Sequence, residues 1–219
     1  MATLMIDNGP TAPDALVTRT GGLPLAPPGT AWPVCATCGG PMQFLAQVLL
    51  NDIDDGTGIT TAPDTDRGVL ALFACQNDPG MCEDWDPAAG GNRALLLPSA
   101  NLQPLPLHEG ADDAVLMLGA VRAVATEHDD NPDYNEAREA WAARTGHPDS
   151  SVLGQLGGTP AWIQGDETPA CPQCARPMPL TVQLEEGPDH STAMNFGTGG
   201  CAYAFTCEPC TQTLLLWQC

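Results

Sequence analysis

Eight of the ten cysteines in this chain fall into two sets of four, and their spacing constrains the fold more than any other feature. The later set has two Cys-x2-Cys pairs separated by 32 residues, and the earlier set has one such pair and a stretched Cys-x6-Cys pair. Four thiolates satisfy the tetrahedral preference of Zn²⁺, and a two-residue spacer lets both sulfurs of a pair face one ion. The pattern predicts two zinc sites, with ligands Cys35, Cys38, Cys75 and Cys82 in the first and Cys171, Cys174, Cys207 and Cys210 in the second.

These two Zn²⁺ ions are expected to be structural, because sulfur at all four positions leaves no coordination position for water or a substrate. In the stretched pair, Pro79 and Gly80 are expected to form the turn that returns Cys82 to its ion. A redox-active pair and disulfide bonds are alternative interpretations of the same spacing. Residues 1–8 lack a basic start and an apolar segment. We therefore expect no secretory signal and a cytoplasmic location, where paired cysteines favour metal binding.

The chain also contains an internal repeat around its two Cys-x2-Cys pairs, without a gap for about 25 residues. Each copy has a Gly-Gly-x-Pro motif before the cysteines and a Pro-Met dipeptide after them, and Gln47 matches Gln183. Further along, residues 68–75 match residues 200–207. The repeat predicts two homologous units that pack as one pseudo-symmetric body.

Both copies are rich in apolar and β-branched segments, and proline and glycine punctuate the rest. The predicted fold is α+β, mainly β, with two tandem homologous β-rich zinc-binding units joined by a short helical segment. Strands are expected over residues 42–50, 69–75, 93–97, 178–184, 201–207 and 213–219. The expected boundaries are 1–98 for the N-terminal unit, 99–150 for an acidic helical connector and 151–219 for the C-terminal unit.

The connector is expected to contain two helices, over residues 112–126 and 132–144, because acidic residues begin both segments and arginine ends the second. The interval 109–139 has a net charge of −7 from nine acids and two arginines. It is either a solvated linker face or a docking surface for a basic partner. The candidate surface comprises Glu109, Asp112, Asp113, Asp129, Asp130, Asp133, Glu136 and Glu139.

Two cysteines, Cys201 and Cys219, lie outside the metal pattern. If the last two strands form a hairpin, residues whose numbers sum to about 420 face each other. We therefore expect Cys201 and Cys219 to be cross-strand neighbours, a reduced buried pair that oxidises only under oxidising conditions. Trp32 and Trp162, near the cysteines of the two copies, are expected in the core.

The charge composition excludes several classes of function. The chain has a formal charge of −20, seven arginines and no lysine. Without lysine there is no Schiff-base nucleophile and no lysine-containing phosphate loop. The acidity disfavours nucleic acid and anionic membranes as partners and favours basic proteins. No apolar run approaches the length needed to span a bilayer.

The order of these motifs resembles the YwqG-like zinc proteins of bacteria and the related programmed cell death protein two family of eukaryotes. Residues 157–164 and 205–218 carry the resemblance best, and residues 35–47 and 68–97 carry it again. It implies a duplicated β-rich zinc fold without an established catalytic centre. Eukaryotic members are chaperones for a ribosomal protein, and some bacterial members are considered immunity proteins against toxins. Only the zinc ligands can be transferred by position.

The expected function is a non-catalytic, structural-zinc binding module that captures or shields a basic protein, as a chaperone or as a toxin-immunity protein. One alternative is an enzyme with an unrecognised site in the cleft between the repeats, which would show clustered carboxylates or histidines in a deep pocket. A nucleic-acid-binding zinc protein is the weakest alternative, because seven arginines face 27 acids.

Overall fold

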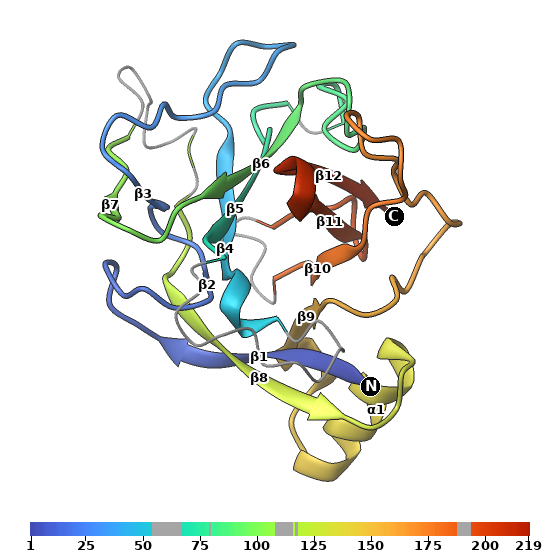
Figure 1. Ribbon diagram of the computed structural model, residues 1–219. Coiled ribbons are helices and arrows are strands. Elements are labelled where there is room, and N and C mark those ends of the chain that lie inside the picture. Colours follow the sequence, from blue (N-terminus) through green and yellow to red (C-terminus); the bar gives the residue numbers. More distant parts are fainter. Residues whose placement is uncertain (54–66, 79, 108–115, 117, 188–193) are drawn as a thin grey trace.

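The fold is built on one large antiparallel sheet, seen in the computed structural model that describes residues 1–53, 67–78, 80–107, 116, 118–187 and 194–219 (Figure 1). Among these residues, ten strands belong to the large sheet and two to a small one. The elements are β1 (Ala2–Pro10), β2 (Arg19–Thr20), β3 (Leu25–Ala26), β4 (Gln43–Leu49), η1 (Leu50–Asp52), β5 (Val69–Ala74), β6 (Asn92–Leu97), β7 (Gln103–Pro104), β8 (Arg122–Asp129), α1 (Tyr134–Thr145), η2 (Asp149–Ser151), β9 (Val152–Leu156), β10 (Leu180–Glu185), β11 (Cys201–Cys207), η4 (Glu208–Cys210) and β12 (Gln212–Gln218).

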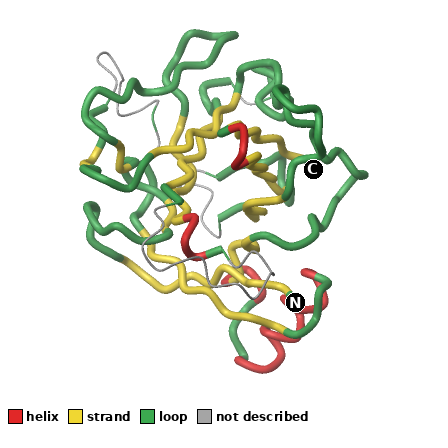
Figure 2. The backbone as a smooth tube through the Cα atoms, viewed as in Figure 1, coloured by secondary structure: helices red, strands yellow, loops and turns green. Residues whose placement is uncertain are grey.

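The large sheet has the strand order β12-β11-β10-β9-β1-β8-β2-β4-β5-β6, and β3 pairs with β7 separately. Its two edge strands, β6 and β12, lie beside each other (Figure 1). The Thr213 hydroxyl donates to the carbonyl of Ala94 at 2.8 Å, and the backbone N–H of Trp217 donates to the backbone carbonyl of Trp85 at 3.3 Å. The sheet therefore curls until its ends meet, with most strands inside and the longer loops outside (Figure 2).

The main core lies on the face that the curled sheet encloses. Apolar side chains from both ends of the chain meet there, including Leu45, Leu72, Leu184 and Leu215, all at most 2% exposed. Two other apolar clusters include most of the cysteines, one around Phe73 and the other around the buried rings of Tyr203 and Phe205. Because burial of such apolar surface is the main favourable contribution to folding, these clusters are expected to stabilise the sheet and the cysteine-bearing turns.

Helix α1 lies beside the first residues of β1, at the N-terminus of the chain (Figure 1). The side chain of Asp133 caps the helix by accepting from the N–H of Glu136 at 3.1 Å, and Gly146 ends it in the left-handed conformation with φ of 72°. Tyr134 and Trp141 are buried against β1 and β9. This helix confirms the prediction over residues 132–144, whose acidic start and glycine end are ordinary capping signals.

The predicted helix over residues 112–126 is wrong where the structure describes it. Residues 112–115 and 117 lie outside the described part, but residues 122–126 belong to β8, which pairs with β1 from Ala2 opposite Asp129 to Pro10 opposite Arg122. The segment alone has an acidic start that favours a helix. Pairing with a strand more than 100 residues away satisfies its backbone instead, which no local pattern reveals.

The six strands predicted around the cysteines are confirmed as β4, β5, β6, β10, β11 and β12, within a few residues at each end. The sequence did not predict β1 or β9, which connect the two halves of the sheet. No helix in the described ranges is both long enough and apolar enough to cross a membrane.

Candidate metal centres

The C-terminal cysteine cluster is built from a tight knuckle before β10 and the turn after β11. In the knuckle, the N–H of Cys171 donates to the carbonyl of Arg176 at 2.8 Å, and the N–H of Ala175 donates to the carbonyl of Cys171 at 2.8 Å. Ala170 and Pro177 close the base of the knuckle as an isolated β-bridge. Strand β11 ends at Cys207, and the single turn of η4 brings Cys210 back toward the knuckle.

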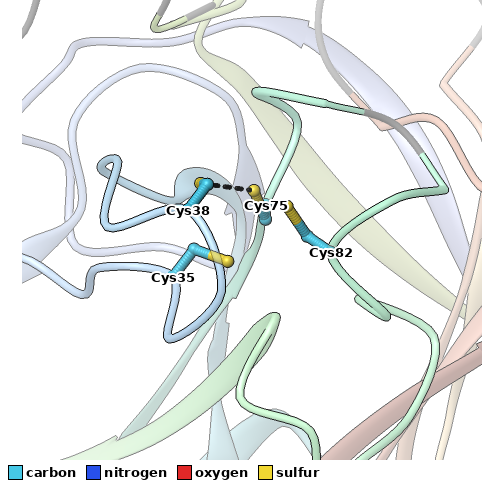
Figure 3. Close-up of side chains that lie close together, drawn as sticks. All are labelled: Cys35, Cys38, Cys75 and Cys82. Carbon is cyan, nitrogen blue, oxygen red and sulfur yellow. Dashed lines mark hydrogen bonds between the residues drawn. The ribbon is translucent and has the colours of Figure 1, made fainter.

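The N-terminal cluster uses the same knuckle before β4. The N–H of Cys35 donates to the carbonyl of Gly40 and the N–H of Gly39 to the carbonyl of Cys35, both at 2.9 Å. Cys75 follows β5 directly, and the stretched pair places Cys82 against the other three sulfurs (Figure 3). Gly80 has φ of 79°, as a turn residue requires, whereas Pro79 lies outside the described residues.

The sulfur geometry of both clusters fits a tetrahedral metal ion. All four Sγ atoms of each cluster lie within 4.8 Å of one another. The Cys38 and Cys75 sulfurs are 3.7 Å apart, and the Cys174 and Cys207 sulfurs are 3.8 Å apart. A Zn–S bond of about 2.3 Å implies an S···S edge of about 3.8 Å in a tetrahedron. All ten cysteines are free thiols, so both clusters present ligand atoms rather than disulfides.

A side-chain amide supports the N-terminal cluster. The Asn77 Nδ2 atom lies 3.5 Å from the Cys38 sulfur and 3.4 Å from the Cys75 sulfur, and it also donates to the carbonyl of Pro41 at 3.2 Å. A Cβ atom on Gly40 would lie only 2.6 Å from that Nδ2. Glycine at position 40 therefore leaves the space in which the amide can reach two sulfurs at once.

The C-terminal cluster uses a charged donor in place of the amide. The Arg176 Nε atom lies 3.5 Å from the Cys174 sulfur. Four thiolates around one Zn²⁺ carry a net charge of −2, so a guanidinium beside them offsets part of that charge. Sequence reasoning did not single out Asn77 or Arg176, although each lies two residues after a cluster cysteine, close enough for its side chain to reach a sulfur.

These contacts shift the thiol pKa values in opposite directions. Hydrogen bonds from the side chain and the backbone N–H of Arg176 lower the pKa of Cys174 to about 6. Burial raises the pKa of Cys38, but hydrogen bonds from Gly40 and Asn77 outweigh it and bring the value to about 7. Burial raises the pKa of Cys75 to about 11, and it raises the pKa of Cys207 above its ordinary value. Each cluster therefore holds a sulfur that ionises readily and others that need a cation's charge to become thiolates.

The expected pairing of Cys201 with Cys219 is wrong. Cys201 lies opposite Gln218, and the register places Cys207 opposite Gln212, so facing residues sum to 419 rather than 420. The reason is the four-residue connection between the paired ends of β11 and β12, which makes the sum odd. A shift of one residue moves a side chain to the other face of a strand. Cys201 is accordingly buried near Gln183, whereas Cys219 is exposed beyond the end of β12.

The candidate acidic surface is only partly within the described residues. Glu109, Asp112 and Asp113 lie outside them, Asp129 is half-buried, and Asp130, Asp133, Glu136 and Glu139 are exposed at the end of β8 and on α1.

The two tryptophans pack as expected against the cysteine clusters. Trp32 is 7% exposed and its ring lies 6.1 Å from that of Phe73, and the half-buried Trp162 lies 4.5 Å from the ring of Tyr203.

The two knuckles differ at the residue in the left-handed conformation, which gives a testable prediction. Ala175 has φ of 58° where the N-terminal knuckle has Gly39 with φ of 70°. Ala175→Gly should relieve about 1–2 kcal/mol of backbone strain, partly offset by about 0.5–1 kcal/mol of extra unfolded-chain entropy. We expect a net stabilisation of about 0.5 kcal/mol in denaturant unfolding. Ala140→Gly, at an exposed position of α1, is the control and should lower the free energy of unfolding by about 1 kcal/mol. Equal destabilisation by both variants would contradict the argument.

Comparison with known proteins places this architecture in a family. The family model described as Domain of unknown function (DUF1963) matches residues 18–209. Over 70 residues the chain is 36% identical to "Uncharacterized protein YpfL" of Salmonella typhimurium, covering 31% of this chain and 15% of that protein. Over 73 residues it is 38% identical to "Methyltransferase-like protein 27" of Homo sapiens, covering 33% of this chain and 29% of that protein. Both matches thus span less than a third of the relative. The family match covers most of the sequence and seven of the eight cluster cysteines, with Cys210 one residue beyond its end, and the chain belongs to the DUF1963 family.

Proposed function

We propose that each cysteine cluster holds one structural Zn²⁺. The support is the convergence of four sulfurs within 4.8 Å of one another in each cluster, with donors from Asn77 and Arg176 on the sulfurs. Every tetrahedral position is filled by the chain, so each ion ties a knuckle to the end of a strand and does not contact a substrate. Eight thiolates add eight negative charges and two Zn²⁺ add four positive charges. The formal charge of −20 therefore becomes −24.

We further propose that residues 1–98 and 151–219 are copies of one unit, joined by residues 99–150, as in the YwqG-like proteins. Equivalent polar contacts support this duplication. Gln47 Oε1 accepts from the N–H of Leu25 at 3.2 Å, and Gln183 Oε1 accepts from the N–H of Ala161 at 3.0 Å. The matching knuckle hydrogen bonds around Cys35 and Cys171 support it as well. Such buried side-chain bonds to a loop are specific enough that their recurrence favours common origin over chance.

For the chain with both zinc ions bound we propose a binding role: it captures a basic protein and does not catalyse a reaction. The observation that carries this proposal is the exposed acidic surface formed by the end of β8 and α1. Seven acids and two arginines between residues 127 and 149 give that segment a formal charge of −5. Asp130 and Glu139 are exposed and form no ion pair within the described residues. Such a surface steers basic partners by long-range attraction.

A capture experiment from the native cytosol tests this role. We expect the zinc-loaded chain to retain a basic protein at low ionic strength and to lose it progressively as salt is added, because screening weakens exposed charge pairs. The double variant Asp130→Asn with Glu139→Gln should slow association by about tenfold at low salt, measured by surface plasmon resonance with the captured protein.

The matched control removes two charges elsewhere on the surface, with Asp14→Asn and Glu167→Gln, both exposed residues. The control should change the association rate by less than about twofold. Capture of no basic protein, or equal slowing by both double variants, would count against the proposed surface.

A further inference from the structure

A turn that follows the N-terminal cysteine cluster carries an exposed tryptophan. Trp85 is 47% exposed, and Met81, four residues earlier, is 69% exposed. Within the part of the chain that the structure describes, the Trp85 ring forms no aromatic pair and its indole N–H donates no hydrogen bond. Tryptophan is among the residues that contribute most to binding at protein interfaces. Neither the sheet nor the metal clusters account for an indole in this position.

The backbone that carries Trp85 is held in place from two sides. The Asn92 Nδ2 atom donates to the carbonyl of Asp84 at 2.8 Å and to the carbonyl of Asp86 at 3.1 Å. On the other side, the backbone N–H of Trp217 in β12 donates to the carbonyl of Trp85 at 3.3 Å. The Trp217 indole N–H donates to the buried Asp84 carboxylate at 3.1 Å. The turn is therefore preorganised, and a partner that binds Trp85 does not have to order this backbone.

Two carboxylates bracket Trp85. The N–H of Asp86 donates to the carbonyl of Glu83 at 3.1 Å, which closes a four-residue turn with Trp85 at its third position. The Cα atoms at the two ends of such a turn lie within about 7 Å of each other. Glu83 is exposed and Asp86 is half-buried, and neither forms an ion pair with a described residue. Residues 76–92 contain four acids and no basic residue, so the local charge is negative.

We propose that this turn binds an arginine side chain of a basic protein, which rests on the capture role proposed for the chain. The guanidinium stacks on the Trp85 indole, and the carboxylates of Glu83 and Asp86 accept its N–H groups. Arginine fits better than lysine, because its planar cation stacks on an aromatic ring and presents several donors in one plane. Met81 adds exposed apolar surface for the rest of the partner segment. A second copy of the chain is disfavoured as the occupant by its formal charge of −20.

Short peptides test the charge and shape of the ligand on the full, zinc-loaded chain. The probes are capped octapeptides in which glycine alternates with arginine, lysine or glutamine. NMR follows the indole N–H resonances of the five tryptophans, and the resonance that Trp85→Leu removes is that of Trp85. We expect a saturable shift of this resonance with the arginine peptide, about threefold weaker binding of the lysine peptide and no binding of the glutamine peptide. No saturable shift with the arginine peptide, or equal binding of either other peptide, overturns the proposal.

Two variants separate the ring from the carboxylates, with binding followed through the amide resonances of residues 83–86. Trp85→Leu removes the aromatic face and should weaken binding of the arginine peptide by about fivefold. The double variant Glu83→Gln with Asp86→Asn keeps the side-chain shapes, removes both charges and should weaken binding by about fivefold at low salt. Leu16→Ala, at another exposed apolar residue, is the control and should leave the affinity unchanged. Unchanged affinity in both test variants, with two zinc ions retained, would refute the assignment.

The captured protein separates this site from the capture role itself. If a basic protein is captured and Trp85→Leu binds it as tightly as the wild-type chain, the arginine site is wrong and the capture role stands. If the arginine peptide binds at Trp85 but no basic protein is captured, the site stands and the capture role fails. A wild-type dimer that Trp85→Leu abolishes, measured by sedimentation, would make a second copy the occupant and would overturn the proposal.

Discussion

Replacing Cys171 with serine is expected to remove one zinc ion per chain and to lower the free energy of unfolding by about 5 kcal/mol or more. Cys171 is 1% exposed and begins the knuckle that joins the two sides of its cluster. Metal affinity at a structural site is folding free energy, because the unfolded chain does not hold the ligands together. A loss of this size removes much of the stability of an ordinary domain.

Elemental analysis and denaturant unfolding measure the two effects separately. The wild-type chain should contain two zinc ions, and Cys171→Ser should contain one. Cys219→Ser is the matched control, since Cys219 is exposed and belongs to neither cluster. It should change neither zinc content nor stability by more than about 0.5 kcal/mol. Far fewer than two zinc ions in the wild-type chain, or full zinc content in Cys171→Ser, would contradict the assignment.

The second large effect is expected from Gly154→Ala in β9. This glycine has φ of 140°, and a Cβ atom there would lie 1.9 Å from the carbonyl oxygen of Gln183. Strand β9 lies between β1 and β10, so its neighbours on both sides are fixed by strand pairing and cannot move apart cheaply. Strain and a forced backbone shift should together lower the free energy of unfolding by about 3 kcal/mol or more.

Gly165→Ala is the control for this substitution. Nothing lies within 4 Å of a Cβ atom at position 165, and its φ is not in the left-handed region. The control should stay within about 0.5 kcal/mol of the wild type in a denaturant melt. If Gly154→Ala has the same free energy of unfolding as Gly165→Ala, then β9 is not held between its neighbours in the way its hydrogen-bonded register indicates.

The two cysteine clusters were the most predictable part of the molecule. A two-residue spacer and the Pro-Met dipeptide after it are local signals, and the knuckles at Cys35 and Cys171 have the same hydrogen bonds. The strands beside them were predictable for a similar reason, since each is a short apolar run bounded by turn residues. The spacing also predicted that Cys82 joins its cluster, but it did not predict the path of the six-residue connection from Cys75.

The register of the last hairpin depends on the number of residues that connect β11 and β12. Whether Cys201 faces Cys219 depends on an even or odd number of residues in the connection, and a strand pattern does not fix that number. The four-residue connection separates the two cysteines to opposite faces. Strand β8 shows a different limit, because its partner β1 is more than 100 residues away.

The sequence by itself determined the eight cluster cysteines, the six strands around them and the acidity, because spacing, hydrophobic pattern and charge act over short lengths of chain. Only the tertiary structure decided that β1, β8 and β9 join the two halves into one curled sheet. These placements depend on contacts between residues far apart in the chain, whose geometry is set by the packing of the whole sheet and leaves no periodic signal in any one segment.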